Sequence, residues 1–321
     1  MGITQYIFSK RQLIAIGLIL AASIVFAIGM VSPHAYPYAF NGDVESALLV
    51  EEEPVVMSRA EQVARALVEA YPRRVLKAEY RNGDWAVLLR DTWFYYAEGR
   101  LLPYELRYRI DQYRPLAFYN NYPRELPEWT PPTPEQVSQF REWGANRTAL
   151  LPRAPHFFDT LYRARNREES YRRVKTIRFL GRNVTVHHAI MEELTLVEDA
   201  ILQAALTDTR VRAWIYDIDR VYGWHWRNVG GTQSRSFHAY GVAVDIIPRT
   251  LGGRSVYWRW AGPNWFNIPH ERRHHPPDAV IRAFQERGFV WGGKWSAFDT
   301  IHFEFRPEVM ILNGIPMSTI R

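Results

Sequence analysis

The chain has 321 residues and a formal net charge of +6, with 47% hydrophobic and 14% aromatic residues. This composition excludes a largely disordered chain and allows a sizeable buried core. Because there is no cysteine, disulfides, thiolate metal ligands and a cysteine nucleophile are excluded, and any metal must be held by histidines and carboxylates. No nucleic-acid-binding motif accompanies the basic charge, so we expect no nucleic-acid partner.

An uncharged, mostly apolar stretch runs from Leu13 to Val31. It is long enough to cross a bilayer as a helix, and the basic residues before it predict a cytoplasmic N-terminus. A cleaved signal peptide is the alternative, which would leave the body secreted or periplasmic, but no clear small-x-small cleavage site follows. The sequence therefore predicts a single-pass protein of the inner (cytoplasmic) membrane, bound to the membrane through this helix, with its body outside the cytoplasm.

Four segments are predicted along the chain. Residues 1–33 are the cytoplasmic tip and transmembrane anchor, and residues 34–57, rich in proline and glutamate, are a linker. Residues 58–180 form an accessory region rich in aromatic residues and arginine. Residues 181–321 form the domain that carries the candidate site.

Helices and a hairpin are predicted in the accessory region. Ser58 can cap a helix, with Glu61 three residues on as its capping-box partner, and Pro72 ends that helix. The predicted elements are, in order, this first helix, a hairpin of residues 86–89 and 93–96, and helices over residues 135–143 and 157–173.

The C-terminal region mixes helix and strand patterns. Residues 179–186 predict a hairpin that turns at Gly181, and residues 188–206 have helical spacing of apolar side chains. Residues 211–221 are expected to begin a strand-rich segment. The predicted fold class is α+β: a small antiparallel sheet carries the site, flanked by helices, with the N-terminal transmembrane helix and the accessory region added to it.

A first candidate pair lies in the stretch from Ser236 to Asp245. Asp245 interrupts the apolar run of residues 242–247, and a carboxylate in a buried strand costs several kcal/mol unless it is paired or bound to a cation. A turn at Gly241 would bring His238 and Asp245 together. For this pair alone, a metal site and an ordinary core aspartate beside a surface histidine remain equally open.

A second stretch adds further candidate ligands. Residues 298–305 alternate, so His302 and Glu304 share one face of a predicted strand, and Asp299 lies where the chain enters it. With His302, the donors form a His-Asp-His set that is typical of zinc sites with an open fourth position. Asp299 could then accept a proton from an attacking water, and Glu304 could orient a ligand.

The motifs Ser-x-His-x6-Asp, Trp-Gly-Gly-x-Trp, Asp-x-x-His and Phe-Glu occur in this order between Val211 and Pro307. Together they resemble the D-Ala-D-Ala carboxypeptidase and L-alanyl-D-glutamate endopeptidase group, within the lysostaphin–hedgehog class of zinc peptidases. The resemblance implies a Zn²⁺ cofactor on His238, Asp245 and His302. It also implies that Asp299 is the catalytic base. Several relatives carry glutamate at this position, and the aspartate here is similar to the endolysin-like branch.

The resemblance further implies an arginine, upstream of the first ligand, that binds the substrate carbonyl and its developing oxyanion. Arg227 is assigned this role ahead of Arg235 and Arg220, and Arg235 is kept as a substrate-binding candidate. Ser236 is a candidate substrate hydrogen-bond donor, with a turn residue as the alternative. Among the other histidines, His225 is a candidate group behind the ligands.

The sequence thus predicts a zinc-dependent metallopeptidase. By resemblance, its partners are peptidoglycan stem peptides, cut at an amide bond next to a D-amino acid, as a D,D-carboxypeptidase or an L,D-endopeptidase. Two alternatives from other classes remain: a non-catalytic cell-wall-binding module, and a structural envelope protein whose histidines and aspartates are core residues.

Overall fold

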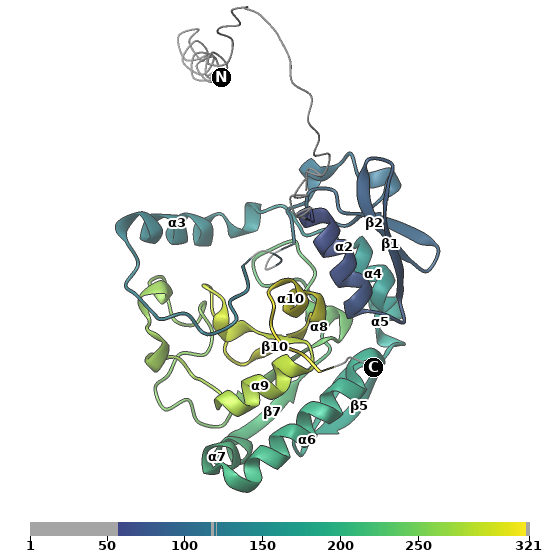
Figure 1. Ribbon diagram of the computed structural model, residues 1–321. Coiled ribbons are helices and arrows are strands. Elements are labelled where there is room, and N and C mark those ends of the chain that lie inside the picture. Colours follow the sequence, from purple (N-terminus) through teal and green to yellow (C-terminus); the bar gives the residue numbers. More distant parts are fainter. Residues whose placement is uncertain (1–56, 117–118, 120, 319–321) are drawn as a thin grey trace, which may run out of the picture. The chain divides into compact units, whose positions relative to one another are not determined.

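The structure is a computed structural model and describes residues 57–116, 119 and 121–318. Helices and antiparallel strands alternate along these residues (Figure 1), which confirms a mixed α+β fold. The helices are α2 (Arg59–Ala70), α3 (Pro134–Ala145), α4 (His156–Tyr162), α5 (Arg167–Tyr171), α6 (Met191–Thr207), α7 (Thr209–Asp217), α8 (Phe237–Tyr240), α9 (Asp278–Glu286) and α10 (Pro307–Leu312). The strands are β1 (Val75–Arg81), β2 (Asp84–Leu89), β3 (Thr92–Tyr95), β4 (Leu102–Pro103), β5 (Val174–Phe179), β6 (Arg182–His187), β7 (Ile218–Tyr222), β8 (Ala243–Pro248), β9 (Phe289–Trp291) and β10 (His302–Phe305).

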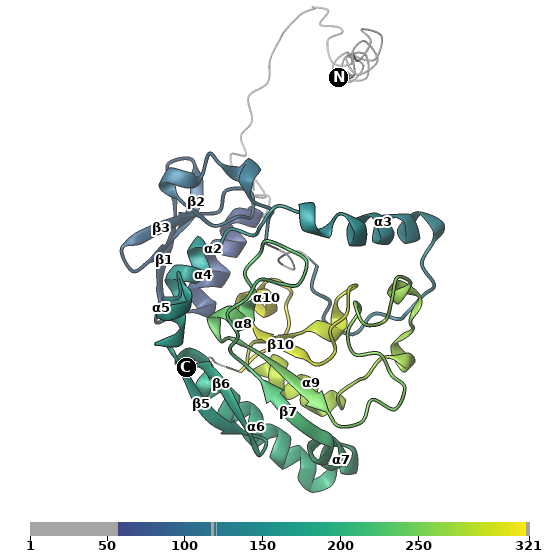
Figure 2. The same ribbon diagram turned by 180° about the vertical axis from the view of Figure 1, so that it is seen from behind.

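Within the described residues, eight strands form two four-stranded antiparallel sheets. One has the order β1-β2-β3-β4, and the other has the order β7-β8-β10-β9, while β5 and β6 pair as a separate hairpin. In the second sheet, β8 and β10 are neighbours although more than fifty residues of chain separate them. Figures 1 and 2 show β10 beside α8 and α10.

Aromatic packing holds the second sheet against its helices. Phe303 of β10 stacks on Phe284 of α9 with ring centroids 3.9 Å apart, and Phe305 packs edge-on against Phe289 of β9. Since neighbouring side chains on a strand point to opposite faces, His302 and Glu304 lie on the other face of β10. Both faces of β10 are buried, so the alternation separates apolar from charged side chains rather than buried from exposed ones.

The predicted accessory region packs into the same core. Helix α2 contacts β1, β2 and α10, and it buries Val63 and Leu67. These side chains belong to one hydrophobic cluster that extends to Ile315. Residue 180, the predicted boundary, lies in the turn between β5 and β6. The division of the chain at that residue stays a prediction.

Several predicted elements are found with adjusted ends. The Ser58 hydroxyl accepts a hydrogen bond from the Glu61 amide and caps α2, while the Glu61 carboxylate binds Arg65 at 2.7 Å instead of closing a capping box. The hairpins of β2–β3 and β5–β6 match the predicted ones in place, and α6 begins after one turn of 3₁₀ helix.

Two predicted elements were wrong in part. The helix expected over residues 157–173 is split into α4 and α5 because Arg163 adopts a left-handed conformation (φ 50°) and Asn166 caps a new helix. The strand-rich segment expected from residue 211 begins instead with α7. The Asp208 side chain caps this helix, and its buried side chains, Val211 and Trp214, lie three residues apart on one face.

The predicted location in the inner membrane is contradicted by the structure. None of the helices formed by residues 57–318 is long and apolar enough to cross a membrane. The longest of these, α6, has 17 residues and carries two glutamates in its first turn, whereas a bilayer crossing takes about 20 apolar residues. The predicted span over Leu13–Val31, and the linker before residue 57, lie outside the described residues.

Candidate metal centre

His238 is placed by the short helix α8. The Ser236 hydroxyl accepts a hydrogen bond from the His238 amide at 3.3 Å, so Ser236 caps the helix and is itself buried. Gly241 ends the helix in a left-handed conformation (φ 73°). A Cβ atom at Gly241 would lie 2.8 Å from Val174 and 2.9 Å from the His187 amide nitrogen, so this turn excludes larger residues both by its conformation and by its surroundings.

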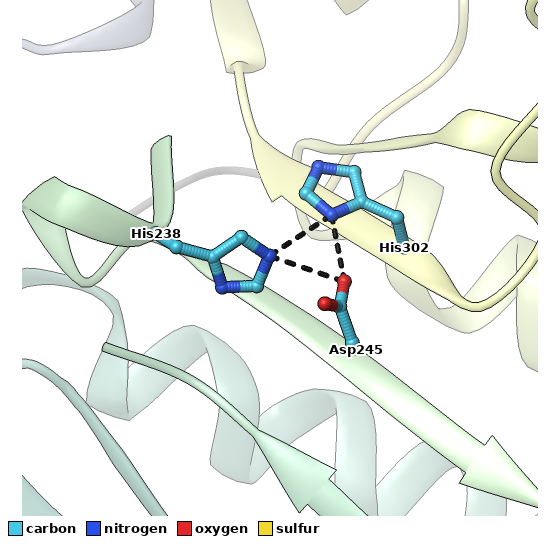
Figure 3. Close-up of side chains that lie close together, drawn as sticks. All are labelled: His238, Asp245 and His302. Atoms are coloured by element: carbon cyan, nitrogen blue, oxygen red, sulfur yellow. Dashed lines mark hydrogen bonds and ion pairs between the residues drawn. The ribbon is translucent and has the colours of Figure 1, made fainter. Parts of the chain in front are cut away.

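Asp245 and His302 face each other across the sheet. They are paired residues in the register of β8 and β10, and Nδ1 of His302 lies 2.8 Å from Oδ1 of Asp245. Nε2 of His238 lies 3.1 Å from the same oxygen and 3.2 Å from Nδ1 of His302. Figure 3 shows the three side chains converging from α8, β8 and β10 on a common point.

The spacing of the three donors fits a tetrahedral metal. Zinc bonds of about 2.0–2.1 Å at tetrahedral angles separate neighbouring ligand atoms by roughly 3.3 Å, and the observed separations run from 2.8 to 3.2 Å. Within the described residues, this trio is the group of histidine and carboxylate side chains whose possible ligand atoms all lie within 4.8 Å of one another. The structure therefore contains a possible metal site.

Hydrogen bonds behind the rings fix which nitrogen of each histidine faces the centre. Nδ1 of His238 donates to the Gly223 carbonyl at 2.6 Å, and Nε2 of His302 donates to Glu304 at 3.2 Å. A ring nitrogen that donates on one side leaves the other as an acceptor. Two imidazole nitrogens and a carboxylate oxygen point at one another. Without a metal, a proton on Nδ1 of His302 lies between that ring and Asp245, and a bound cation would take its place.

The charges of the site reinforce one another. Burial alone would raise the pKa of Asp245, but His238 and His302 hold it well below its usual range. Burial alone would lower the pKa of His302, but the carboxylates of Asp245 and Glu304 raise it to about 10. Asp245 therefore stays ionised, as a metal ligand must be.

Asp299 lies beside the trio without joining it. Its amide donates to the Gly292 carbonyl at 3.0 Å, and its carbonyl accepts from the His302 amide at 3.3 Å. Its Oδ1 atom is buried and has no hydrogen-bond partner among the described residues. Burial, together with the charge of Asp245, raises the pKa of Asp299 to about 7 against the opposing charge of His302. A carboxyl group with this pKa can take up and release a proton near neutral pH.

The Trp-Gly-Gly-x-Trp motif supports the loop that holds Asp299. A Cβ atom on Gly292 would lie 2.5 Å from the Asp299 carbonyl oxygen, and one on Gly293 would lie 2.0 Å from the Trp291 ring. The ring of Trp295 packs against His302 with centroids 5.4 Å apart. The two glycines thus leave room for close packing against the Asp299 backbone and the Trp291 ring.

Residues 230–305 match the family model described as D-alanyl-D-alanine carboxypeptidase. This stretch contains all three donors and Asp299, and the match supports the predicted resemblance at the level of that zinc peptidase family. Residues 63–118 match a domain of unknown function, and no solved structure matches the chain.

The three arginine candidates occupy different surroundings. Arg235 forms an ion pair with Asp159 and donates to the Ala164 carbonyl, so its guanidinium is held within the fold. Arg220 is exposed and pairs with the neighbouring Asp219. Arg227 is exposed, and its charge lowers the pKa of Asp299, which places it within electrostatic range of the candidate base.

His225, the further histidine candidate from the sequence, and three other histidines of the described chain lie outside the trio. The His225 side chain is exposed, and its amide donates to the His238 carbonyl at 3.1 Å. His187 is buried, and its Nε2 atom donates to the Tyr162 carbonyl. His274 and His275 are likewise not part of the trio.

A buried row of charged and phenolic groups behind the site was missed by the sequence reasoning. Glu304 contacts Arg306 at 3.4 Å, and Arg306 donates to Glu308 at 2.5 Å. Glu308 also accepts hydrogen bonds from Tyr71 at 2.7 Å and from Tyr119 at 3.4 Å. The alternation of Glu304, Arg306 and Glu308 was a visible signal for three of these five residues. Its connection to Tyr71 spans more than 200 residues and leaves no local pattern.

Proposed function

We propose that this protein is a zinc-dependent peptidase that hydrolyses an amide bond next to a D-amino acid in peptidoglycan stem peptides. One observation carries the proposal: the donor atoms of His238, Asp245 and His302 converge beside Asp299, a carboxylate with a buried oxygen that no described group binds. The family match over residues 230–305 supports the peptide substrate class.

The donor set suits zinc better than magnesium or calcium. Two imidazole nitrogens and one carboxylate leave a fourth position open, as in catalytic zinc sites, whereas magnesium and calcium take sets of oxygen atoms. Bound zinc would polarise a carbonyl group and make water acidic enough to attack it near neutral pH.

The roles of the chain's own residues follow from their places. Asp299 would accept the proton of the attacking water and pass it to the leaving amine. Arg227, exposed and close enough to act on the charge of Asp299, would stabilise the negative charge that develops on the carbonyl oxygen. Glu304 and the Gly223 carbonyl would hold the His302 and His238 rings in the orientation that turns one nitrogen of each toward the metal.

A pure binding module would not need Asp299. A carboxyl oxygen that is buried without a partner is unfavourable for folding, and it is a typical feature of a group that acts on a ligand. This observation favours the enzyme over a cell-wall-binding module that only keeps the fold.

The test is the mass analysis of muropeptides incubated with the purified protein. We expect new products with the zinc-loaded protein, none after the metal is chelated, and recovery when zinc is added back. The masses of the products identify the bond that is cut and separate a carboxypeptidase from an endopeptidase. If the zinc-loaded protein cleaves no muropeptide, the proposal is wrong.

A further inference from the structure

A second concentration of chemistry lies away from the metal centre. A cavity of about 290 Å³ opens between the end of α2, the β2–β3 turn, the end of α4 and the start of β5. Six of its lining residues are basic: Arg74, Arg90, Arg163, Arg173, His187 and His188. The other two lining residues are Leu161 and Tyr162, so none of the carboxylates in the described part of the chain lines this cavity.

The four arginines have no acidic partner among the described residues. None of them forms an ion pair with a carboxylate of residues 57–318. Negatively charged groups line an adjoining cavity of about 590 Å³. Among the described residues, this cavity shares Arg90, Arg163 and Arg173 with the first one and is also lined by three carboxylates. Two of these are already engaged, because Asp159 binds Arg235 and Glu169 binds Arg165. The third, Asp91, accepts a hydrogen bond from Thr92.

The positive charge around the cavity affects the pKa values of its two histidines. Burial lowers the pKa of both His187 and His188, and the charges of Arg74 and Arg173 lower it further. Like charges that are brought together from separate segments repel one another unless an anion lies between them.

Two of the arginines adopt a left-handed backbone conformation that glycine adopts at lower cost. Arg90 in the β2–β3 turn has φ 62°, and Arg163 at the end of α4 has φ 50°. Side chains other than glycine, asparagine and aspartate rarely adopt this left-handed conformation. The chain thus places a guanidinium at the cavity from two strained positions where the backbone alone favours glycine.

We propose that this cavity is an anion site that binds a phosphate group, as a monoester or a diester. A phosphate offers several oxygens in different directions and accepts paired hydrogen bonds from planar guanidinium groups. Four guanidiniums from separate segments suit such a ligand better than a carboxylate, which has two oxygens in one plane. The site is independent of the proposed peptidase activity.

The test is calorimetric titration of the full chain at constant ionic strength. Inorganic phosphate serves as the probe for a monoester, diethyl phosphate for a diester, and acetate for a carboxylate. We expect at least one of the two phosphate probes to bind, and acetate to bind at least about ten-fold more weakly. If neither phosphate probe binds, or if acetate binds as tightly, the proposal is overturned.

The variant Arg90→Gly/Arg163→Gly separates loss of binding from loss of folding. Glycine relieves the strain at both positions, so this variant should stay folded by circular dichroism while phosphate affinity falls at least about ten-fold. The control Arg178→Ser/Arg282→Ser removes the same charge from exposed positions outside both cavities. Unchanged affinity in the first variant, or an equal loss in the control, would contradict the proposal.

Discussion

Oε2 of Glu304 lies 3.2 Å from Nε2 of His302, on the side of the ring away from Asp245. Glu304 is buried, and its own charge is balanced by Arg306. The carboxylate therefore holds the His302 ring with Nδ1 turned toward the candidate metal site, and this hydrogen bond leads to the first prediction.

Replacing Glu304 should weaken the binding of zinc. Glu304→Ala removes the acceptor that orients His302, and we expect the affinity for zinc to fall about 10–100-fold, as measured by competition with a chelator. Glu304→Gln keeps an acceptor oxygen and should fall between the wild type and the alanine variant. Equal affinities for all three proteins would show that the contact does not orient the ligand.

Variants of Asp299 and His238 should differ in whether they keep zinc when they lose activity. Asp299→Asn keeps the shape of the side chain but cannot accept a proton, so turnover of muropeptides should fall about 10²–10⁴-fold while zinc stays bound. His238→Ala should lose zinc and activity together, because it removes a ligand. Metal analysis of both purified variants checks the assignment; loss of zinc from Asp299→Asn would make Asp299 a ligand.

Tyr71 and Glu308 should matter for stability although they lie behind the site. Tyr71→Phe removes a buried 2.7 Å hydrogen bond to Glu308 and should lower the free energy of unfolding by about 1–2 kcal/mol. Glu308→Gln leaves the buried Arg306 poorly paired and should cost about 3–5 kcal/mol. Urea denaturation measures both. As a control, Tyr80→Phe alters an exposed ring and should change stability by less than about 0.5 kcal/mol.

Gly241 should tolerate no side chain. Gly241→Ala meets a left-handed backbone penalty of about 1 kcal/mol and an overlap with Val174 and His187 that adds about 1–3 kcal/mol. Gly83 has a similar φ of 83° but open space around its Cβ position. Gly83→Ala should therefore show the backbone penalty alone. If thermal denaturation gives the two variants the same stability, close packing at Gly241 is not what excludes a side chain.

His187 should make the protein sensitive to acid. Its Nε2 atom donates to the Tyr162 carbonyl, its Nδ1 atom accepts from the Ala189 amide, and burial lowers its pKa to about 3. Between an unfolded-state pKa of about 6.5 and this value, only the unfolded chain binds the proton. The stabilising effect is thus complete above about pH 6.5 and is lost as the pH falls toward 3.

The comparison of wild type with His187→Gln isolates this effect. The free energy of unfolding of the wild type should fall faster on acidification, by up to about 1.4 kcal/mol per pH unit over that window. The advantage of the wild type over the variant should therefore shrink from pH 6.5 to pH 3. Parallel curves for the two proteins would show that His187 does not titrate differently in the folded and unfolded states.

The sequence by itself determined the local features of this protein. Capping by Ser58, the turn at Gly181 and the alternation through His302 and Glu304 depend on residues a few positions apart, and short-range sterics and hydrogen bonds settle them. The same reasoning singled out Asp245 as a costly carboxylate in an apolar run, but it left a metal role for the pair of His238 and Asp245 open. The pattern around His302 added a third candidate, and the resemblance to zinc peptidases implied the full set.

Only the tertiary structure decided what depends on partners distant in the sequence. The pairing of β8 with β10 sets Asp245 opposite His302. The fold also brings Tyr71 within hydrogen-bond distance of Glu308. It pairs Arg235 with Asp159, so the Arg235 guanidinium is held within the fold. The split at Arg163 was also beyond local pattern, because the left-handed residue there is not a glycine. Such contacts follow from packing over the whole chain, and no spacing in the sequence records them.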